Sequence, residues 1–199
     1  MSHTVRGGQA ARVSLRDDET VVMLVCRAEF MPPDRLGHED PRPALRQAYG
    51  DMGWEVPELL DAMDASDEVY FDRVSQIHLP RWSTNRVVLV GDAAACPSLL
   101  AGEGSGLGML EAYVLAGALH RAGDDWAGAL AAYESRLQAF VAGKQKAALW
   151  NRGFFAPKTA LGLRMRNLAV RAFALPWLGK PFWKRSLHDD FTLPEYQMS

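Results

Sequence analysis

The chain has 199 residues, of which 48% are apolar, and a formal net charge of -2. This length and composition predict a globular protein with one domain or slightly more, and they exclude a disordered chain. A nearly balanced charge gives no general affinity for nucleic acid, and no run reaches the roughly 20 apolar residues that span a bilayer.

The amino terminus and the cysteines bear on the cellular compartment. The first eight residues lack the apolar segment of a secretory signal. Cys26 and Cys96 show no metal-ligand spacing, so two free thiols in a reducing compartment are expected. The sequence therefore predicts a cytoplasmic protein without a metal site.

The first 80 residues alternate short apolar runs with turns. Residues 11–15 and 21–25 flank a short polar loop, which predicts a β-hairpin. The other elements expected here are a proline-rich loop, two short helices and a strand, at residues 31–41, 43–49, 57–63 and 69–79.

Four consecutive apolar residues, Val87–Val90, open the next part of the chain. A strand without alternation is typical of a parallel sheet covered by helices on both faces. A long helix is expected at 105–121, and the next helix begins at Asp124 or Asp125, either of which can cap it. That helix has apolar residues at helical spacing, and helical patterning resumes over 161–175. The spaced residues are Trp126, Leu130, Tyr133, Leu137 and Phe140.

The chain supplies few strands to flank Val87–Val90, and it contains no strand–G-x-G-x-x-G–helix unit. We therefore expect it to be the carboxyl-terminal part of something larger.

An acidic residue and a glycine-rich turn follow the apolar strand. Gly91 permits a sharp turn, and Asp92 then stands where open α/β sheets place their ligands. The glycine-rich run 102–108 opens a helix whose free N–H groups can face an anion or a carbonyl edge. This order predicts half of a cofactor site.

These residues resemble a known family. Residues 86–119, with Trp82 just before, are similar to the second flavin-binding motif of the FAD-dependent monooxygenases of the para-hydroxybenzoate hydroxylase group. The resemblance implies an α/β (α+β) fold: an incomplete Rossmann-like FAD-binding domain, part of a β-rich substrate domain and a helical carboxyl-terminal region. It places these at residues 81–150, 1–80 and 151–199, respectively.

The resemblance also implies a cofactor site. The Asp92 carboxylate would bind the ribityl chain of FAD, and the start of the long helix would point its N–H groups at the flavin ring. A helix amino terminus stabilises the negative charge of a reduced flavin by about 0.3–2 kcal/mol. The cofactor-binding residues expected on this basis are Gly91, Asp92, Gly102, Gly104, Ser105, Gly106 and Leu107.

Three positions depart from the family's pattern. Ala95 replaces an aromatic residue or histidine, Leu99 a proline, and Gly106 a polar side chain. Contacts made by the backbone survive such changes, whereas contacts made by side chains do not. Asp92 and the amide groups therefore carry the expected site. The alternatives are that Asp92 is a solvated turn residue and that the glycines serve only tight strand–helix packing.

The implied chemistry is reduction of the flavin by NADPH or NADH, reaction with oxygen to a flavin hydroperoxide, and oxygen transfer to a small-molecule substrate. Because the unit that holds the ADP half of FAD is missing, we expect an amino-terminal flavin-binding chain or segment as partner. No catalytic side chain is assigned. Two further residues have open alternatives: His78 faces a substrate cavity or is structural, and Cys96 is reactive or a small filler.

The charge is unevenly distributed, because residues 135–188 contain 11 Lys and Arg and no Asp or Glu. This basic region also contains aromatic residues, a combination that suits an anionic membrane surface. The alternative is a solvated face that balances the acidic front half. A second hypothesis for the chain is therefore a non-catalytic remnant that binds a partner subunit or a membrane. The residues concerned are Lys158, Arg164, Arg166, Arg171, Lys180, Lys184 and Arg185, beside Phe154, Phe155, Trp177, Phe182 and Trp183.

Overall fold

The computed structural model describes residues 1–16, 19–32, 40–175 and 191–196. It divides into two compact units, one within residues 1–72 and 152–182 and the other within 73–151 and 183–199. The described parts of the expected carboxyl-terminal region, 151–199, therefore belong to two different units. The assignment of substrate-binding and flavin-binding roles to these parts stays a prediction.

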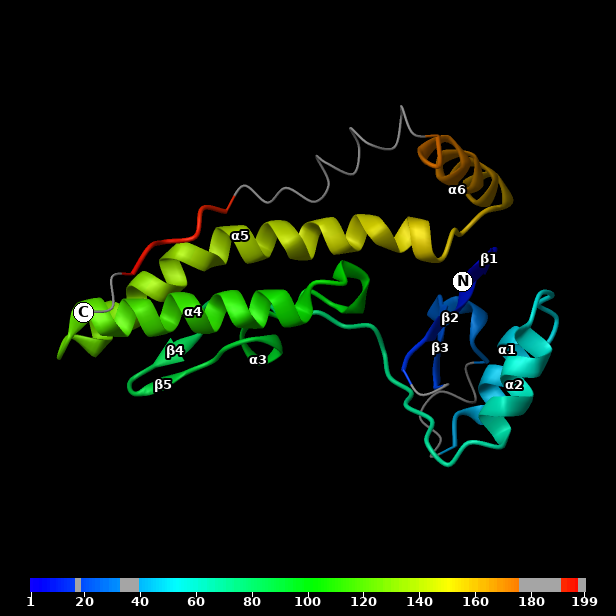
Figure 1. Ribbon diagram of the computed structural model, residues 1–199, viewed down its shortest axis with the longest axis horizontal. Coiled ribbons are helices and arrows are strands. Elements are labelled where there is room, and N and C mark those ends of the chain that lie inside the picture. The colour runs from blue at the N-terminus through cyan, green and yellow to red at the C-terminus, as the bar shows by residue number, and fades with distance from the viewer. Residues whose placement is uncertain (17–18, 33–39, 176–190, 197–199) are drawn as a thin grey trace. The chain divides into compact units, whose positions relative to one another are not determined.

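The first unit is built on an antiparallel sheet in the order β1-β2-β3 (Figure 1). β2 (Gly8–Ser14) pairs with β3 (Thr20–Cys26), which confirms the predicted hairpin. β1 (Ser2–Val5) adds a strand that the sequence analysis did not predict. Gly7 joins β1 to β2 with a φ of 87°, a conformation that favours glycine.

Two short helices complete the core of this unit. α1 (Arg42–Tyr49) and α2 (Val56–Asp64) confirm the predicted helices, and each has a proline in its first turn. A 3-10 turn, η1 (Ala28–Phe30), follows β3. Apolar side chains from the sheet and the helices form one buried cluster: Ala10, Met31, Ala44, Leu45, Tyr49, Met52, Val56 and Leu60.

The last described helix of this unit is α6 (Ala160–Phe173), close to the predicted range. The Thr159 side chain caps it by accepting a hydrogen bond from the Gly162 N–H. Unlike α1 and α2, α6 contains no buried residue.

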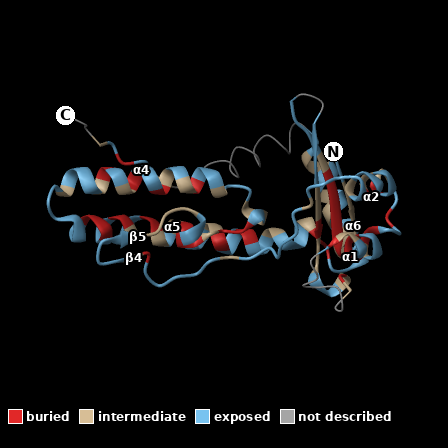
Figure 2. Ribbon diagram, turned by 90° about the horizontal axis from the view of Figure 1, so that it is seen from below, coloured by how far each residue is buried: buried red, intermediate tan, exposed pale blue. Residues whose placement is uncertain are grey.

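The second unit is dominated by two long helices that lie side by side (Figure 1). α4 (Gly104–Ala122) confirms the predicted helix. α5 (Trp126–Phe155) begins after Asp125, whose carboxylate accepts a hydrogen bond from the Gly128 N–H at 3.0 Å. The predicted inner stripe of α5 is buried at Leu130, Tyr133 and Leu137, whereas Trp126 is exposed and Phe140 only partly buried. Figure 2 shows buried segments along α5.

Two expectations about strands were wrong. Residues 69–79 form no strand, since their backbone pairs with no neighbouring ladder and most of their side chains are exposed. The apolar run is a strand only at β5 (Val87–Val88), which pairs antiparallel with β4 (Ser83–Thr84). Because no third strand joins this pair among the described residues, Val87 is 61% exposed. The burial expected on both faces is therefore not seen.

Short helical turns connect β5 to α4: α3 (Asp92–Ala95) and the 3-10 turn η3 (Leu99–Ala101). Residues from these connections and from the long helices form the second core cluster: Trp82, Ala94, Ala95, Val114, Tyr133, Leu137 and Val141.

Residues 191–196 form a strap along α4 and α5. The Tyr113 hydroxyl donates to the Pro194 carbonyl at 2.9 Å, and the Tyr196 hydroxyl donates to the Val114 carbonyl at 3.3 Å. The Tyr196 ring lies so close to Gly117 that a Cβ there would come within 2.2 Å of it. The strap thus requires glycine at this buried helical position.

Candidate functional site

The turn after β5 brings the backbone very close to α4. Gly91 has a φ of 66°, in the region that favours glycine, and a Cβ on it would lie 3.9 Å from the Gly108 Cα. Since this is an ordinary van der Waals distance, the positive φ of Gly91 is what favours glycine at this turn. Asp92 follows as the first residue of α3 and is exposed. The sequence placed Asp92 at the end of a strand, and the structure places it in the turn beyond β5.

Asp92 lies beside the Cys96 thiol, to which it is hydrogen-bonded. Burial raises the pKa of this thiol, the Ser98 backbone N–H lowers it, and the negative charge of Asp92 raises it further. A raised pKa disfavours the thiolate, which favours the interpretation of Cys96 as a small filler over that of a reactive residue.

The start of α4 presents unpaired backbone donors next to Asp92. The first backbone hydrogen bond of the helix runs from the Leu107 N–H to the Glu103 carbonyl at 2.9 Å, so the N–H groups of Gly104, Ser105 and Gly106 precede it. A Cβ on Gly104 would lie 3.6 Å from Asp92 Oδ1, which shows that the carboxylate and the helix start are adjacent.

The remaining expected site residues differ in accessibility. Gly102 and Gly106 are exposed, and a Cβ on either would meet no atom within 4 Å. Ser105 is exposed, whereas the Leu107 side chain is buried and its N–H is already engaged by the helix. The structure therefore brings Gly91, Asp92 and the first turn of α4 together, with Leu107 serving the core.

Sequence reasoning missed a buried carboxylate behind this turn. Glu111 is 1% exposed and accepts hydrogen bonds from the Gly91 N–H and the Tyr133 hydroxyl. Burial raises its pKa, the two hydrogen bonds oppose that shift, and the charge of Asp92 adds to it. Helical spacing in the sequence could have predicted the burial of Glu111, since it stands between Leu107 and Val114 on the inner face of α4.

Two glutamines fix the chain between α3 and α4. The Gln145 side-chain amide donates to the Cys96 carbonyl at 3.4 Å, and the Gln76 amide donates to the Pro97 carbonyl at 2.9 Å. His78 Nε2 lies 3.0 Å from Gln76 Oε1. A cavity of about 370 Å³ adjoins these groups and is lined by His78 among others. The alternatives of a substrate-facing and a structural His78 therefore both stay open.

A single cation stands near the start of α4 in the described ion pairs. Lys144 Nζ lies 2.6 Å from a Glu103 carboxylate oxygen. Within the same described residues there is no group of three or more His, Cys, Asp or Glu side chains that could hold a metal ion. The groups at this site are therefore the Asp92 carboxylate, the amide N–H groups at the start of α4, the ion pair of Lys144 with Glu103, and the buried acid.

Comparisons with known proteins agree with the expected family. A flavin-dependent monooxygenase of Legionella longbeachae is 31% identical over 176 residues, which cover 87% of this chain and 43% of that protein. The FAD-dependent monooxygenase asL6 of Sarocladium schorii is 36% identical and matches 66% of this chain and 31% of its own length. No family model matches the chain.

A solved structure extends the similarity to the fold. The tetracycline destructase Tet(55) superposes with a TM-score of 0.75 at 28% identity, covering 97% of this chain and 49% of that protein. The chain thus has an α+β fold similar to that of a tetracycline destructase, and it spans about half or less of the length of these relatives.

The predicted resemblance is confirmed: this chain is a homologue of the flavin-dependent monooxygenases and corresponds to part of such a protein.

Proposed function

We propose that the chain contributes the carboxylate and amide side of an FAD site in a monooxygenase. The adjacency of Asp92 Oδ1 to Gly104, at the free amino end of α4, carries the proposal. FAD offers two kinds of group to Asp92 and the amino end of α4. Its ribityl hydroxyls donate hydrogen bonds to a carboxylate, and its flavin ring becomes anionic on reduction.

The residues around Asp92 and the start of α4 leave room for a flavin. The glycines at 102 and 106 leave open space where side chains would stand, so a planar ring can approach the backbone N–H groups. Ala95, Leu99 and Gly106 depart from the family pattern only in side chains, and the amide donors of the first turn of α4 do not depend on those side chains.

The bound flavin would supply the oxidation chemistry, with NADPH or NADH as reductant and a small molecule as oxygen acceptor. In this proposal Asp92 orients the ribityl chain, and the amino end of α4 stabilises negative charge on the ring. The partner that completes the site is an amino-terminal flavin-binding chain or segment, and the complete protein acts in the cytoplasm. Residues other than Asp92 and the start of α4 determine which substrate is oxidised, because the same fold serves many different substrates.

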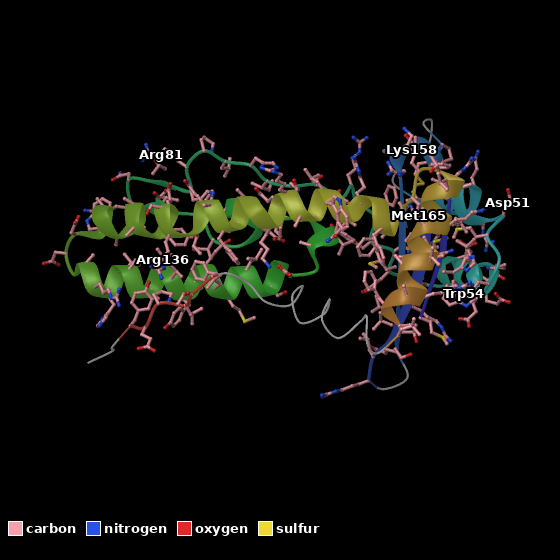
Figure 3. The ribbon with its side chains drawn as sticks, turned by 90° about the horizontal axis from the view of Figure 1, so that it is seen from above. Asp51, Trp54, Arg81, Arg136, Lys158 and Met165 are labelled. Carbon is pink, nitrogen blue, oxygen red and sulfur yellow. The ribbon has the colours of Figure 1, made fainter. Side chains whose placement is uncertain are left out.

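The test is a titration of FAD followed by flavin fluorescence. The chain is measured alone and after co-expression with the part of the Legionella relative that it does not match. Asp92→Ala removes a charge-assisted hydrogen bond and should weaken binding by roughly ten- to a hundredfold. Asp51→Ala is the matched control, since Asp51 is also an exposed turn acid but lies in the first unit (Figure 3). Equal affinity of the wild type and Asp92→Ala contradicts the proposal.

A second candidate function is contact with an anionic membrane surface through α6. Three apolar residues lie on one stripe of this helix and are at least 61% exposed: Leu161, Met165 and Leu168. Figure 3 labels Met165 on this helix. Exposed Arg164 and Arg171 accompany the stripe, a pattern that favours an interfacial helix. Lys180, Lys184, Arg185, Trp177, Phe182 and Trp183 lie outside the described residues.

Sedimentation with vesicles tests this second candidate. Binding to vesicles with phosphatidylserine, and its loss in Leu161→Ser/Leu168→Ser, would support it. Equal sedimentation with purely zwitterionic vesicles would contradict the electrostatic part. No helix in the described part of the chain is both long and apolar enough to cross a membrane, so the contact proposed here is peripheral.

A further inference from the structure

Glu111 is the most deeply buried ionisable acid near the proposed site. It projects from the third helical turn of α4 toward the turn at Gly91, with 1% of its surface exposed. Charged side chains are seldom fully buried unless they are paired. Its partners are neutral donors: the Gly91 backbone N–H and the Tyr133 hydroxyl.

The charges that face this group from neighbouring elements are negative. Asp92 of α3 acts on Glu111, and Glu134 of α5 acts on Tyr133. Burial and the charge of Asp92 raise the pKa of Glu111, whereas burial and the charges of Glu111 and Glu134 raise the pKa of Tyr133. Keeping an ionisable acid here is therefore unfavourable for packing, which points to a role other than core filling.

The Tyr133 hydroxyl has two acceptors for its single proton. Its oxygen lies 3.1 Å from the Leu89 carbonyl oxygen, and it also bonds to Glu111. When Glu111 is ionised, the hydroxyl can donate to the carboxylate. When Glu111 is protonated, the acid can donate to the Tyr133 oxygen, and the hydroxyl proton turns to Leu89. Both arrangements satisfy the tyrosine.

The Gly91 peptide is the part of this turn that a hydrogen bond to its N–H restrains most. Gly91 has a φ of 66°. Glycine has more backbone freedom than any other residue type, so its conformation here needs a restraint. Its neighbour Asp92 holds the carboxylate of the proposed flavin site. A bond that fixes the Gly91 N–H therefore fixes the direction from which Asp92 leaves the turn.

We infer that Glu111 is a positioning residue of the flavin site, which holds the Gly91 peptide through its buried carboxylate and so aligns Asp92 with the start of α4. This inference rests on the proposed FAD function. Glu111 itself does not touch the flavin in this arrangement, and it acts through Gly91.

Two substitutions separate positioning from simple packing. Glu111→Leu fills the space but offers no acceptor. Glu111→Gln keeps an amide oxygen for the Gly91 N–H, while its NH₂ group donates to Tyr133 and the Tyr133 hydroxyl donates to Leu89. The glutamine variant should therefore rescue the position of Gly91 without a titratable proton. Val114→Ala is the control for a packing change on the same buried face of α4.

The first measurement is independent of flavin: amide hydrogen exchange at Gly91 in the full chain, followed by NMR. Glu111→Leu should raise the exchange rate at Gly91 by about tenfold or more, the typical effect of losing a buried hydrogen bond. Glu111→Gln and Val114→Ala should leave it within about threefold of the wild type, once corrected for global stability. An unchanged rate in Glu111→Leu would overturn the inference.

The second measurement is FAD affinity against pH, on the same co-expressed material. Glu111→Leu should lose about tenfold in affinity at neutral pH, and Glu111→Gln should stay within about threefold. In the wild type, protonation of Glu111 toward acidic pH should leave the affinity within the same threefold range of Glu111→Gln, because the protonated acid keeps a carbonyl oxygen for the Gly91 N–H just as glutamine does. If the wild type binds no FAD, the proposed function itself fails. If the wild type and Glu111→Leu bind FAD equally, only the inference about Glu111 fails.

Discussion

α5 and α6 are both amphipathic in sequence, yet they have opposite fates in the structure. α5 buries seven residues, including Tyr133 and Leu137, against α4 and the turns of the second unit. α6 buries none, although it carries Leu161, Met165 and Leu168. An apolar stripe thus contributes to the stability of this chain only where a second element covers it.

The largest effect is expected in the buried stripe of α5. Leu137→Ala should reduce the free energy of unfolding by about 2–5 kcal/mol, because the Leu137 side chain is fully buried and a cavity would remain. Urea denaturation followed by tryptophan fluorescence measures the change. A loss well below 1 kcal/mol would mean that this part of α5 is not a packed core.

The strap at 191–196 should be nearly as sensitive. Gly117→Ala should displace Tyr196 and destabilise the chain by about 1–3 kcal/mol, because the new Cβ would overlap the ring. Limited proteolysis near the carboxyl terminus should then proceed faster. The matched control is Gly143→Ala in α5, which meets no atom within 4 Å and should stabilise the helix by about 0.5–1 kcal/mol. Equal proteolysis of Gly117→Ala and the wild type would contradict the docking of Tyr196.

The buried acid Glu111 should make the free energy of unfolding depend on pH in a defined direction. The pKa of Glu111 is raised in the folded chain, so the folded state binds more protons than the unfolded state between the ordinary and the raised pKa. The contribution of Glu111 to stability therefore falls as pH rises through that interval. In Glu111→Gln this fall should be missing when the unfolding curves of the two proteins are compared at pH values from the ordinary carboxyl pKa upward. Parallel curves would show that Glu111 does not titrate there.

The smallest effect is expected on α6. Leu161→Ser should change the free energy of unfolding by no more than about 0.5 kcal/mol, because this side chain is 69% exposed. The same denaturation experiment measures it beside Leu137→Ala. A cost above 1 kcal/mol would show that the stripe of α6 is covered in solution and would remove the reason to propose a membrane contact there.

The local signals in the sequence were sufficient for most helices and for the hairpin. Prolines in the first turns located α1 and α2, Asp125 marked the start of α5, and alternation with a polar loop gave β2 and β3. The motif from Gly91 to Leu107 likewise identified the family by residues close together in the chain. The cofactor-binding roles of those residues stay a prediction.

Other features depend on residues far apart in sequence. The run Val87–Val90 predicted a buried parallel strand, but a strand is buried only when neighbours pair with it and cover it, and here β5 has β4 alone. Residues 69–79 have strand-like composition and no partner ladder. The contacts of Tyr196 with Gly117 and of Glu111 with Gly91 join positions 79 and 20 residues apart. Helical spacing places Glu111 on the inner face of α4, but no local pattern encodes either contact.

The sequence by itself therefore determined where helices begin, which chain segments turn, and to which family the chain is related, because caps, prolines, glycines and short motifs act over a few residues. Tertiary structure alone decided which apolar stripes are buried, that Asp92 meets the start of α4, and that a carboxylate stands behind Gly91. Those outcomes depend on the approach of separate elements, which is set by packing over the whole unit.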